Sequence, residues 1–169
     1  ASATGQVMSA VGIADCLTAL RPHWERALRD VAAVPGRGVG IASCWYGCGN
    51  TALPNPSTIR IGITQAGQLV LHQGATDIGQ GSNTVITQIA AQALGVSVAD
   101  FALIGPDTAL SPDAGKTSAS RQTFVSGRAA MAAGLALRAE LVRLANGDGP
   151  IAFAPGAVQV GARRLDLRA

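Results

Sequence analysis

The stretch Gly74–Ser82, GATDIGQGS, decides how the rest of this chain is organised. An alternating apolar run precedes it and a helical pattern follows it, so it marks the point where a strand gives way to a helix. Glycine permits positive φ and lets a ligand approach the main chain, and the first N–H groups of a helix have no partners within that helix. The stretch is therefore a candidate anion site; the alternative is that its glycines only make a tight turn.

The residues before this stretch predict a β-hairpin. Ile59, Ile61 and Ile63 alternate with polar or small residues, residues 65–68 carry a turn signal, and the return strand starts at Leu69. One face of this hairpin is expected to be buried. Its return strand leads directly into the glycine-rich stretch.

The residues after it predict a helix with Ser82 as its N-cap and Gly95 as its stop. Apolar side chains recur in this helix at helical spacing, at Val85, Ile86, Ile89, Ala90, Ala93 and Leu94. A short strand at Phe101–Ile104 follows. The chain then enters a second polar loop, residues 105–118 (GPDTALSPDAGKTS), which opens into a longer helix beginning near Ser120. Residues 146–150 close that helix.

The two ends of the chain complete the expected fold. A helix is predicted over residues 22–33, with Pro22 in its first turn, followed by a buried strand over residues 39–45. Near the other end, a hairpin is predicted in which Val158 and Val160 face Leu165 and Leu167. This order of elements predicts an α+β fold of two layers, with helices packed on one face of a mixed or antiparallel sheet.

The same pattern predicts three parts along the chain. They are an N-terminal helical segment (1–37), an α+β domain (38–148) and a C-terminal hairpin (149–169) that is an incomplete part of an adjoining region.

Composition excludes several classes of function. The chain has 169 residues and a formal net charge of +3, its only lysine is Lys116, and aromatic residues make up 4%. Scattered arginines with few aromatics argue against nucleic-acid binding. No run of 18 apolar residues predicts a membrane span, and no secretion signal is visible. The three cysteines are expected to be reduced thiols, so a cytoplasmic location is expected.

No catalytic or metal-binding residues can be assigned from the sequence. The two histidines and three cysteines lack metal-ligand spacing, and the aspartates of the two loops, Asp77, Asp107 and Asp113, are of a type that commonly stabilises turns. Residues 115–117 (GKT) match the end of a P-loop, but Leu110 stands where that motif needs a glycine. An NTPase site is therefore not expected.

The two loops instead carry groups suited to a ligand with phosphates and a ring system. Thr117, Ser118 and Ser120 can donate hydroxyl hydrogen bonds, and Arg121 can bind a phosphate bidentately. Gln80 and Gln122 have amide side chains that can bond to the edge of a heterocycle. Lys116 adds a point charge.

These motifs resemble the molybdopterin-binding subunit of the xanthine dehydrogenase and aldehyde oxidase family. The first matching stretch comprises residues 77–81 (DIGQG), Thr84, residues 88–90 and residues 94–96 (LGV). The second comprises residues 107–108, 112–115 (PDAG), 117–123 (TSASRQT) and Gly127, in the same order and at similar spacing. The resemblance covers nearly the whole chain, with weaker matches at residues 4–6 and 38–41.

The resemblance implies a function for these residues. Domain 38–148 would bind molybdopterin, and Ile78, Gly79, Gln80 and Gly81 would contact the pterin. Thr117 would belong to the same site, and Ser118, Ala119, Ser120, Arg121 and Gln122 would hold the phosphate or the nucleotide tail, commonly a cytosine dinucleotide. The enzymes of this family oxidise an aldehyde or an N-heterocycle with oxygen from water. Their 2Fe-2S clusters and FAD lie on other domains or chains, so those and the remainder of the molybdenum subunit are the implied partners.

The sequence also departs from the family pattern. The earlier glycine-rich motif with its arginine-bearing substrate pocket and the later catalytic glutamate are absent, since Glu25 and Glu140 are the only glutamates and both fall on helical faces. The chain is therefore expected to be an inactive part of the enzyme. An alternative from a different class is a non-catalytic assembly or structural module whose loops stay empty.

Overall fold

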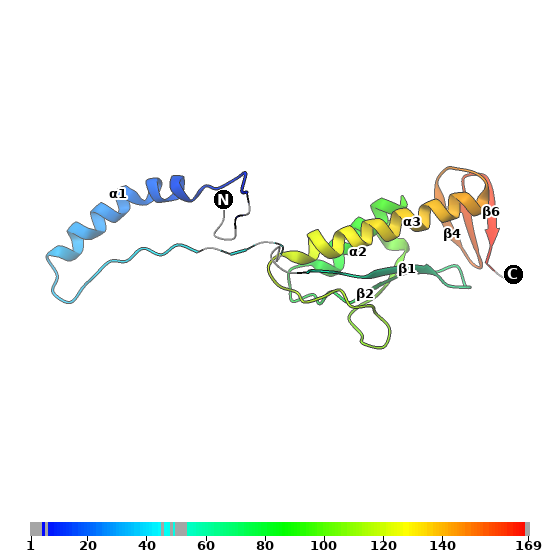
Figure 1. Ribbon diagram of the computed structural model, residues 1–169, viewed down its shortest axis with the longest axis horizontal. Coiled ribbons are helices and arrows are strands. Elements are labelled where there is room, and N and C mark those ends of the chain that lie inside the picture. Colours follow the sequence, from blue (N-terminus) through cyan, green and yellow to red (C-terminus); the bar gives the residue numbers. More distant parts are fainter. Residues whose placement is uncertain (1–4, 6, 45, 48, 50–53, 168–169) are drawn as a thin grey trace. The chain divides into compact units, whose positions relative to one another are not determined.

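The computed structural model describes residues 5, 7–44, 46–47, 49 and 54–167. The chain divides into two compact units, residues 1–46 and 47–169 (Figure 1). No helix within the described parts of the chain combines enough length and apolarity to cross a membrane.

The described residues of the N-terminal unit form one helix, α1 (Ile13–Ala32). It begins nine residues before the predicted start, so the placement of Pro22 in a first turn was wrong: Pro22 lies inside the helix. Apolar residues at helical spacing on both sides of the proline, Leu17 and Leu20 before it and Trp24 and Leu28 after it, continue one face through that point. Proline there removes one backbone hydrogen bond without ending the helix.

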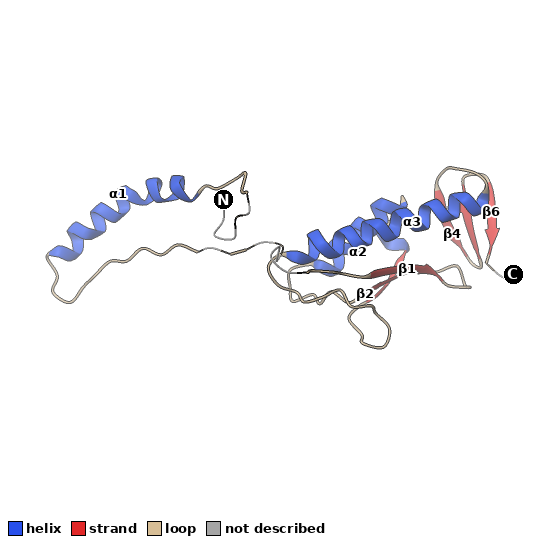
Figure 2. Ribbon diagram, viewed as in Figure 1, coloured by secondary structure: helices blue, strands red, loops and turns tan. Residues whose placement is uncertain are grey.

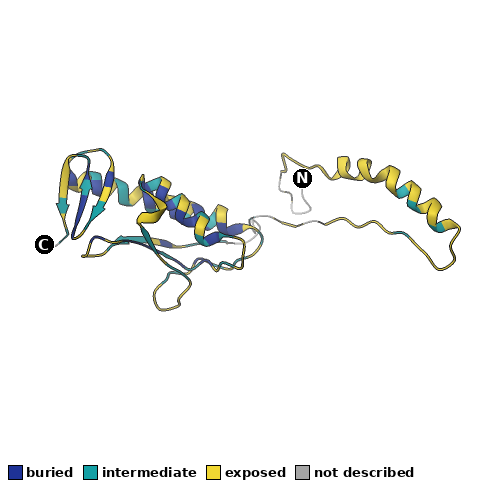
Figure 3. Ribbon diagram, turned by 180° about the vertical axis from the view of Figure 1, so that it is seen from behind, coloured by how far each residue is buried: buried dark blue, intermediate teal, exposed yellow. Residues whose placement is uncertain are grey.

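The predicted strand at residues 39–45 was also wrong. Residues 39–44 have no regular structure, and Trp45 lies outside the described residues. An apolar run becomes a strand only when a second strand pairs with it, and no described segment pairs with this one. None of the described residues of this unit is buried, as Figure 3 shows for α1.

The larger unit contains two sheets and two long helices (Figure 2). Its elements in chain order are β1 (Ile59–Ile63), β2 (Leu69–Gln73), α2 (Ser82–Leu94), the 3₁₀ helix η1 (Val98–Asp100), β3 (Phe101–Ile104), the π-helical turn η2 (Gln122–Ser126), α3 (Gly127–Ala145), β4 (Ile151–Ala154), β5 (Ala157–Val160) and β6 (Arg163–Asp166).

The first sheet has the strand order β1-β2-β3. β1 pairs antiparallel with β2, with Ile61 opposite Leu71, which confirms the predicted hairpin. β3 confirms the predicted strand and pairs parallel with β2, so the sheet is mixed. The parallel pair requires a crossover connection, and α2 supplies it.

The second sheet is antiparallel, with the order β4-β5-β6. The predicted terminal hairpin is present, with Val158 opposite Leu165, but Val160 lies opposite Arg163 and not opposite a leucine. The strand β4, next to β5, was missed at the sequence level, because four residues after Pro150 give too short a pattern to separate a strand from a loop.

Helices α2 and α3 lie together against the first sheet (Figure 1). One apolar cluster joins the sheet to both helices through Leu71, Ile86, Ala90 and Ala130. A second cluster joins Leu69 and the end of α2 to α3 and to the inner face of the second sheet, through Leu94, Leu141, Val158 and Val160. The predicted α+β fold class is confirmed, with a second small sheet in addition.

The start of α2 differs from its prediction in one detail. Gly81, at φ 82°, is the N-cap, and Ser82 is the first helical residue. The capping bond to the backbone N–H of Asn83 comes from the side chain of Asp77, so Ser82 is not needed for it. Gly95, at φ 84°, ends the helix as predicted.

Candidate functional site

The first loop, residues 74–82, contains an anionic side chain, the carboxylate of Asp77. In the carboxylate of Asp77, Oδ1 accepts hydrogen bonds from the backbone N–H of Gly79 (2.9 Å) and Gly81 (3.2 Å). Oδ2 accepts a bond from the N–H of Asn83 at 3.1 Å. These bonds, led by the one from Asn83, lower the pKa of Asp77 below the ordinary 3.8. The backbone amides that were predicted to bind an anion are thus occupied by the Asp77 side chain.

The tip of this loop is closed by Gln80. Its Oε1 accepts a bond from the N–H of Ile78 at 2.7 Å, and its Nε2 donates to the carbonyl of Thr76 at 3.3 Å. Residues 78–80 are exposed, and the Ile78 side chain is 72% exposed. A Cβ built on Gly79 or Gly81 would meet nothing within 4 Å. The loop therefore presents an open, largely uncharged surface.

The second loop, residues 105–118, is followed by two residues with an unusual backbone conformation. Ala119 and Ser120 both have positive φ, at 51° and 54°, a region that non-glycine residues rarely adopt. The π-helical turn η2 follows directly. Such features cost free energy and cluster at functional sites. Ser118, Ser120 and Lys116 are exposed, and the two serine hydroxyls have no hydrogen-bond partner among the described residues.

The two loops are joined to each other. The Thr117 hydroxyl donates to the carbonyl of Thr76 at 2.7 Å, and this carbonyl also accepts the bond from Gln80. Thr117 in turn accepts a bond from Gln122 Nε2 at 2.9 Å. At Gly74 the backbone of Pro112 approaches so closely that a Cβ could not fit. Two stretches that are about 40 residues apart thus form one surface.

Gln122 and Arg121 lie beneath this surface. Gln122 is 4% exposed, and its side chain bonds to Lys116, Thr117 and Ser126. Arg121 is 1% exposed, and its guanidinium donates to the side chain of Asn55 and to the carbonyls of Pro56, Ala114 and Lys116. Of the predicted site residues, Ile78, Gly79, Gln80, Ser118 and Ser120 are exposed, Gly81, Thr117 and Ala119 are half-buried, and Arg121 and Gln122 are buried.

Sequence reasoning missed three polar residues that support the site. Asn55 accepts a bond from Arg121, and Ser57 donates to Ser126, which donates to Gln122. Asn55 stands between two prolines, in the sequence PNP, which fixes the backbone on both sides of it. That local rigidity is the signal that could have identified it.

Hollows adjoin the joined loops in the part of the chain that the structure describes. One, of about 440 Å³, lies between the first loop and residues 106–113, where it is lined by Gly74, Thr76, Pro106, Asp107, Thr108, Ser111, Pro112 and Asp113. Another, also about 440 Å³, begins at Ser120 and continues along α2 and α3 past Ile89, Phe124 and Met131.

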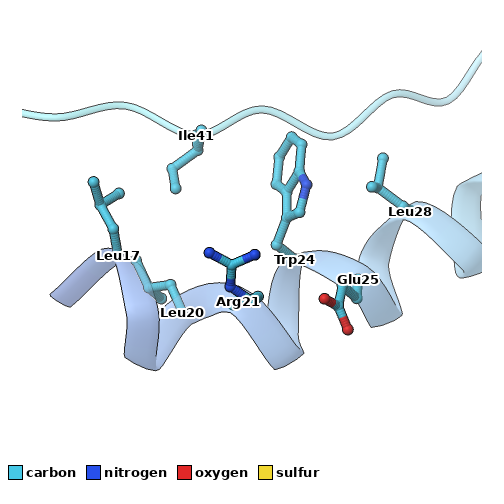
Figure 4. A pocket seen from close by; sticks show the side chains of 7 residues that line it. All are labelled: Leu17, Leu20, Arg21, Trp24, Glu25, Leu28 and Ile41. Atoms are coloured by element: carbon cyan, nitrogen blue, oxygen red, sulfur yellow. The ribbon is translucent and has the colours of Figure 1, made fainter. Parts of the chain in front are cut away.

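A further hollow, of about 510 Å³, belongs to the N-terminal unit. In it, Leu17, Trp24 and Leu28 of α1 point toward the extended segment that carries Ile41 (Figure 4). None of the predicted site residues lines it.

The described residues contain no group of three His, Cys, Asp or Glu side chains that could hold a metal ion. Both glutamates are exposed. Glu140 pairs with Arg143 at 2.6 Å on the surface of α3, which lowers the pKa of Glu140. Glu140 lines neither of the hollows at the joined loops.

Comparison with known proteins identifies a family. Residues 18–168 match the family described as the molybdopterin cofactor-binding domain. The putative xanthine dehydrogenase molybdenum-binding subunit of Escherichia coli K12 is 33% identical over 147 residues, which are 82% of this chain and 19% of that one. The aldehyde oxidoreductase of Megalodesulfovibrio gigas is 30% identical, over 75% of this chain and 15% of that one.

Solved structures agree with this result. The aldehyde oxidoreductase of Desulfovibrio desulfuricans matches 82% of this chain and 16% of that chain, with a TM-score of 0.54 and 25% identity. The reconstituted CO dehydrogenase of Oligotropha carboxidovorans matches 90% of this chain and 22% of that chain, with a TM-score of 0.53 and 19% identity, a likeness of fold alone. The chain spans less than a fifth of the length of the curated relatives above. With a family match that covers nearly all of its residues, this chain belongs to the molybdopterin cofactor-binding domain family, as found in xanthine dehydrogenases and aldehyde oxidoreductases.

Proposed function

We propose that residues 78–81 and 117–122 form one cofactor site, and that the chain acts as a molybdopterin-binding part of a molybdenum hydroxylase. The observation that carries this proposal is the hydrogen bond from the Thr117 hydroxyl to the Thr76 carbonyl at 2.7 Å. It makes one surface of two loops, and a ligand that combines a ring system with a phosphate needs both.

The charge distribution suits the two loops to different parts of the ligand. The ionised Asp77 lies within the first loop and disfavours a phosphate there, while the exposed main chain of Gly79 and the Ile78 side chain suit an uncharged ring. Ile78, Gly79, Gln80 and Gly81 therefore contact the pterin. The Asp77 charge also keeps its own loop in shape, because three backbone amides depend on it.

The second loop suits the phosphate or a nucleotide tail such as cytosine dinucleotide. Ser118 and Ser120 offer two exposed hydroxyl donors, and Lys116 adds a positive charge nearby. The left-handed backbone at Ala119 and Ser120 fixes the directions of these groups before a ligand arrives. Thr117 and Gln122 hold this loop against the first one, and Arg121 lies beneath it.

The bound cofactor supplies the redox chemistry by which an aldehyde or an N-heterocycle is hydroxylated with oxygen from water. This chain contributes binding and orientation only. The 2Fe-2S and FAD groups, the catalytic base and the substrate pocket belong to the remainder of the molybdenum subunit and to its partner subunits. A relative 34% identical over half of this chain is subunit gamma of the 6-hydroxypseudooxynicotine dehydrogenase complex of Paenarthrobacter nicotinovorans, which favours such an assembly.

The binding site is tested with 6-hydroxymethylpterin phosphate as a fluorescent probe in equilibrium titrations. We expect saturable binding by the chain, and a weaker affinity by about a hundredfold in the double variant Ser118→Ala, Ser120→Ala, since each of the two lost hydrogen bonds to a charged group contributes about tenfold. Thr84→Ala, on the exposed side of α2, is the matched control. No binding by the unmodified chain would favour the alternative, an assembly module with empty loops.

The absence of a catalytic base gives a second expectation. The purified chain supplied with the molybdenum cofactor should show no oxidation of aldehydes or purines, because Glu140, the only glutamate of residues 47–169, pairs with Arg143 on the surface of α3 and lines neither hollow at the site. The measurement is substrate-dependent reduction of an artificial electron acceptor. Turnover by the chain alone would contradict this assignment.

A further inference from the structure

Arg121 is a buried cation without a carboxylate partner. Its side chain is 1% exposed, the largest of the fully buried side chains, and no described Asp or Glu lies within ion-pair distance of it. Removing a guanidinium from water is costly unless every N–H finds an acceptor. The surroundings of Arg121 supply neutral acceptors instead of an anion.

These acceptors come from two separate segments. Nε donates to Asn55 Oδ1 at 2.5 Å, and Nη2 donates to the carbonyl of Pro56 at 2.8 Å. On the other side, Nη1 donates to the carbonyls of Ala114 (2.5 Å) and Lys116 (3.0 Å). One planar side chain thus sets the distance between residues 55–56 and residues 114–116, neither of which lies in a helix or strand.

The second loop is shaped around this guanidinium. Gly115 has φ 70°, and a Cβ there would lie 2.8 Å from both terminal nitrogens of Arg121. Immediately before Arg121 stand the two left-handed residues, and the carbonyl of Ala119 accepts a bond from the N–H of Gly49 at 2.6 Å. The strained backbone is therefore held from beneath by Arg121 and from the side by residue 49.

We infer that Arg121 is a positioning residue, which holds residues 114–120 against residues 55–56 and does not contact the phosphate of the ligand. The fork of the guanidinium donates in three directions at once, which a lysine ammonium on a flexible stem cannot reproduce with the same geometry. The effect of Arg121 on ligand binding rests on the proposed function, whereas its structural role does not.

The structural role is tested by hydrogen exchange of backbone amides in the chain without ligand. The variants are Arg121→Lys, which keeps the charge, and Asn55→Ala, which leaves Arg121 in place; Arg128→Lys, an exposed arginine on α3, is the control. In both variants the reporter is the amide of Thr58, which bonds to the carbonyl of Asp113. The amide of Gly49, which bonds to the carbonyl of Ala119, is a second reporter for Arg121→Lys alone, because Asn55 Nδ2 itself donates to the Gly49 carbonyl at 2.5 Å. We expect each variant to speed exchange at its reporters about tenfold or more and to leave β4 to β6 unchanged, because the opening is local. Unchanged exchange at the reporters would overturn the inference.

The ligand consequence is tested with two probes, 6-hydroxymethylpterin and its phosphate ester. Arg121→Lys and Asn55→Ala should both lower the affinity for the phosphate ester, since each loosens the second loop, to which the proposed function assigns the phosphate, and both should change the affinity for the unphosphorylated pterin less. If Arg121 were a direct phosphate ligand, Asn55→Ala would leave the affinity for the ester unchanged, and that result overturns the inference. If the unmodified chain binds neither probe, the proposed function fails, while the exchange measurement still decides the role of Arg121.

Discussion

At the scale of single residues, the groups left for a ligand are those that the protein does not use itself. Asp77 and Gln80 occupy amides of the first loop, and Arg121 gives its donors to carbonyls and one amide oxygen. Ser118 and Ser120 remain exposed. Arg121, the residue best suited by type to bind an anion, thus has a structural role. The hydroxyl groups of Ser118 and Ser120 remain available to contact the ligand.

Asp77 makes the first loop sensitive to acid. Its folded pKa is lowered by the amides of Asn83, Gly79 and Gly81, so its contribution to stability is present above the unfolded value of 3.8 and is lost as pH falls through the folded value. We expect the amide proton shifts of these three residues to titrate together with a midpoint below 3.8, and to stay flat between pH 5 and pH 8.

The matched variants are Asp77→Asn, in which this titration should disappear, and Asp107→Asn, in which it should persist, because Asp107 bonds to residues 109 and 110 of the other loop. The measurement is an NMR pH titration. A midpoint at or above 3.8 would contradict the assigned bonds.

Thr117 joins the loops through a single hydroxyl. Thr117→Val should destabilise the chain by about 1 kcal/mol, because the Thr76 carbonyl and Gln122 each lose one partner while keeping another. Thr117→Ser keeps the hydroxyl and should cost less. Urea unfolding midpoints measure the difference, and a larger loss in Thr117→Ser than in Thr117→Val would show that the methyl group, rather than the hydroxyl, matters.

Residue types could be predicted from the sequence, but their partners could not. The hydroxyls and amides of both loops stand out from the flanking apolar patterns. The bonds that define the site link residues far apart in the chain, as between Thr117 and Thr76 (41 residues apart) and between Arg121 and Asn55 (66 residues apart). No local pattern encodes such pairs, and therefore the burial of Arg121 was not foreseen.

At the scale of elements, the packing of α2 on α3 depends on small residues. A Cβ built on Gly134 would lie 2.8 Å from the Cβ of Ala93 and 2.9 Å from the carbonyl oxygen of Ala90, neither of which can rotate away. A Cβ on Gly127 would lie 2.7 Å from Cδ1 of Ile89, the end of a flexible side chain. Of the two glycines of α3, Gly134 therefore faces atoms that cannot move away, and Gly127 faces a side chain that can.

This contrast gives a paired prediction. Gly134→Ala should destabilise the chain by about 1 kcal/mol or more, because overpacking between helices outweighs the gain in helix propensity. Gly127→Ala should be close to neutral, since Ile89 can shift while the propensity gain remains. Thermal unfolding of the two variants measures the difference, and a stabilised Gly134→Ala would show that the helices can separate freely.

Elements with strong periodicity were predictable, and weakly patterned ones were not. The hairpin of β1 and β2, the helix α2 and the strand β3 follow from alternation, helical spacing and a stop glycine. The start of α1 and the strand β4 did not follow, because a proline suggested a helix start and a four-residue strand gives little pattern. The π-helical form of η2 has no sequence signature.

At the scale of the whole molecule, the two units contribute unequally to stability. Both apolar clusters lie in residues 47–169, and no described residue before Tyr46 is buried. The apolar face of α1 therefore contributes little to the unfolding free energy of this chain.

A shortened chain of residues 47–169 should accordingly unfold with nearly the same free energy as residues 1–169, within about 0.5 kcal/mol, the usual scale of surface changes. Urea unfolding followed by far-ultraviolet circular dichroism compares the two. A loss of several times that size would show that the N-terminal unit supports the fold.

The π-helical turn η2 has a consequence for the evolution of this domain. Such a turn arises when one extra residue enters an α-helix, so a relative that lacks a residue between Gln122 and Ser126 would have a continuous helix there. Arg121, the helical residue before η2, would then be rotated by about 100° around the helix axis, and its guanidinium would leave its acceptors. Family members that keep the extra residue can therefore hold the second loop through an arginine at this position. Members that lack it need another way to hold that loop.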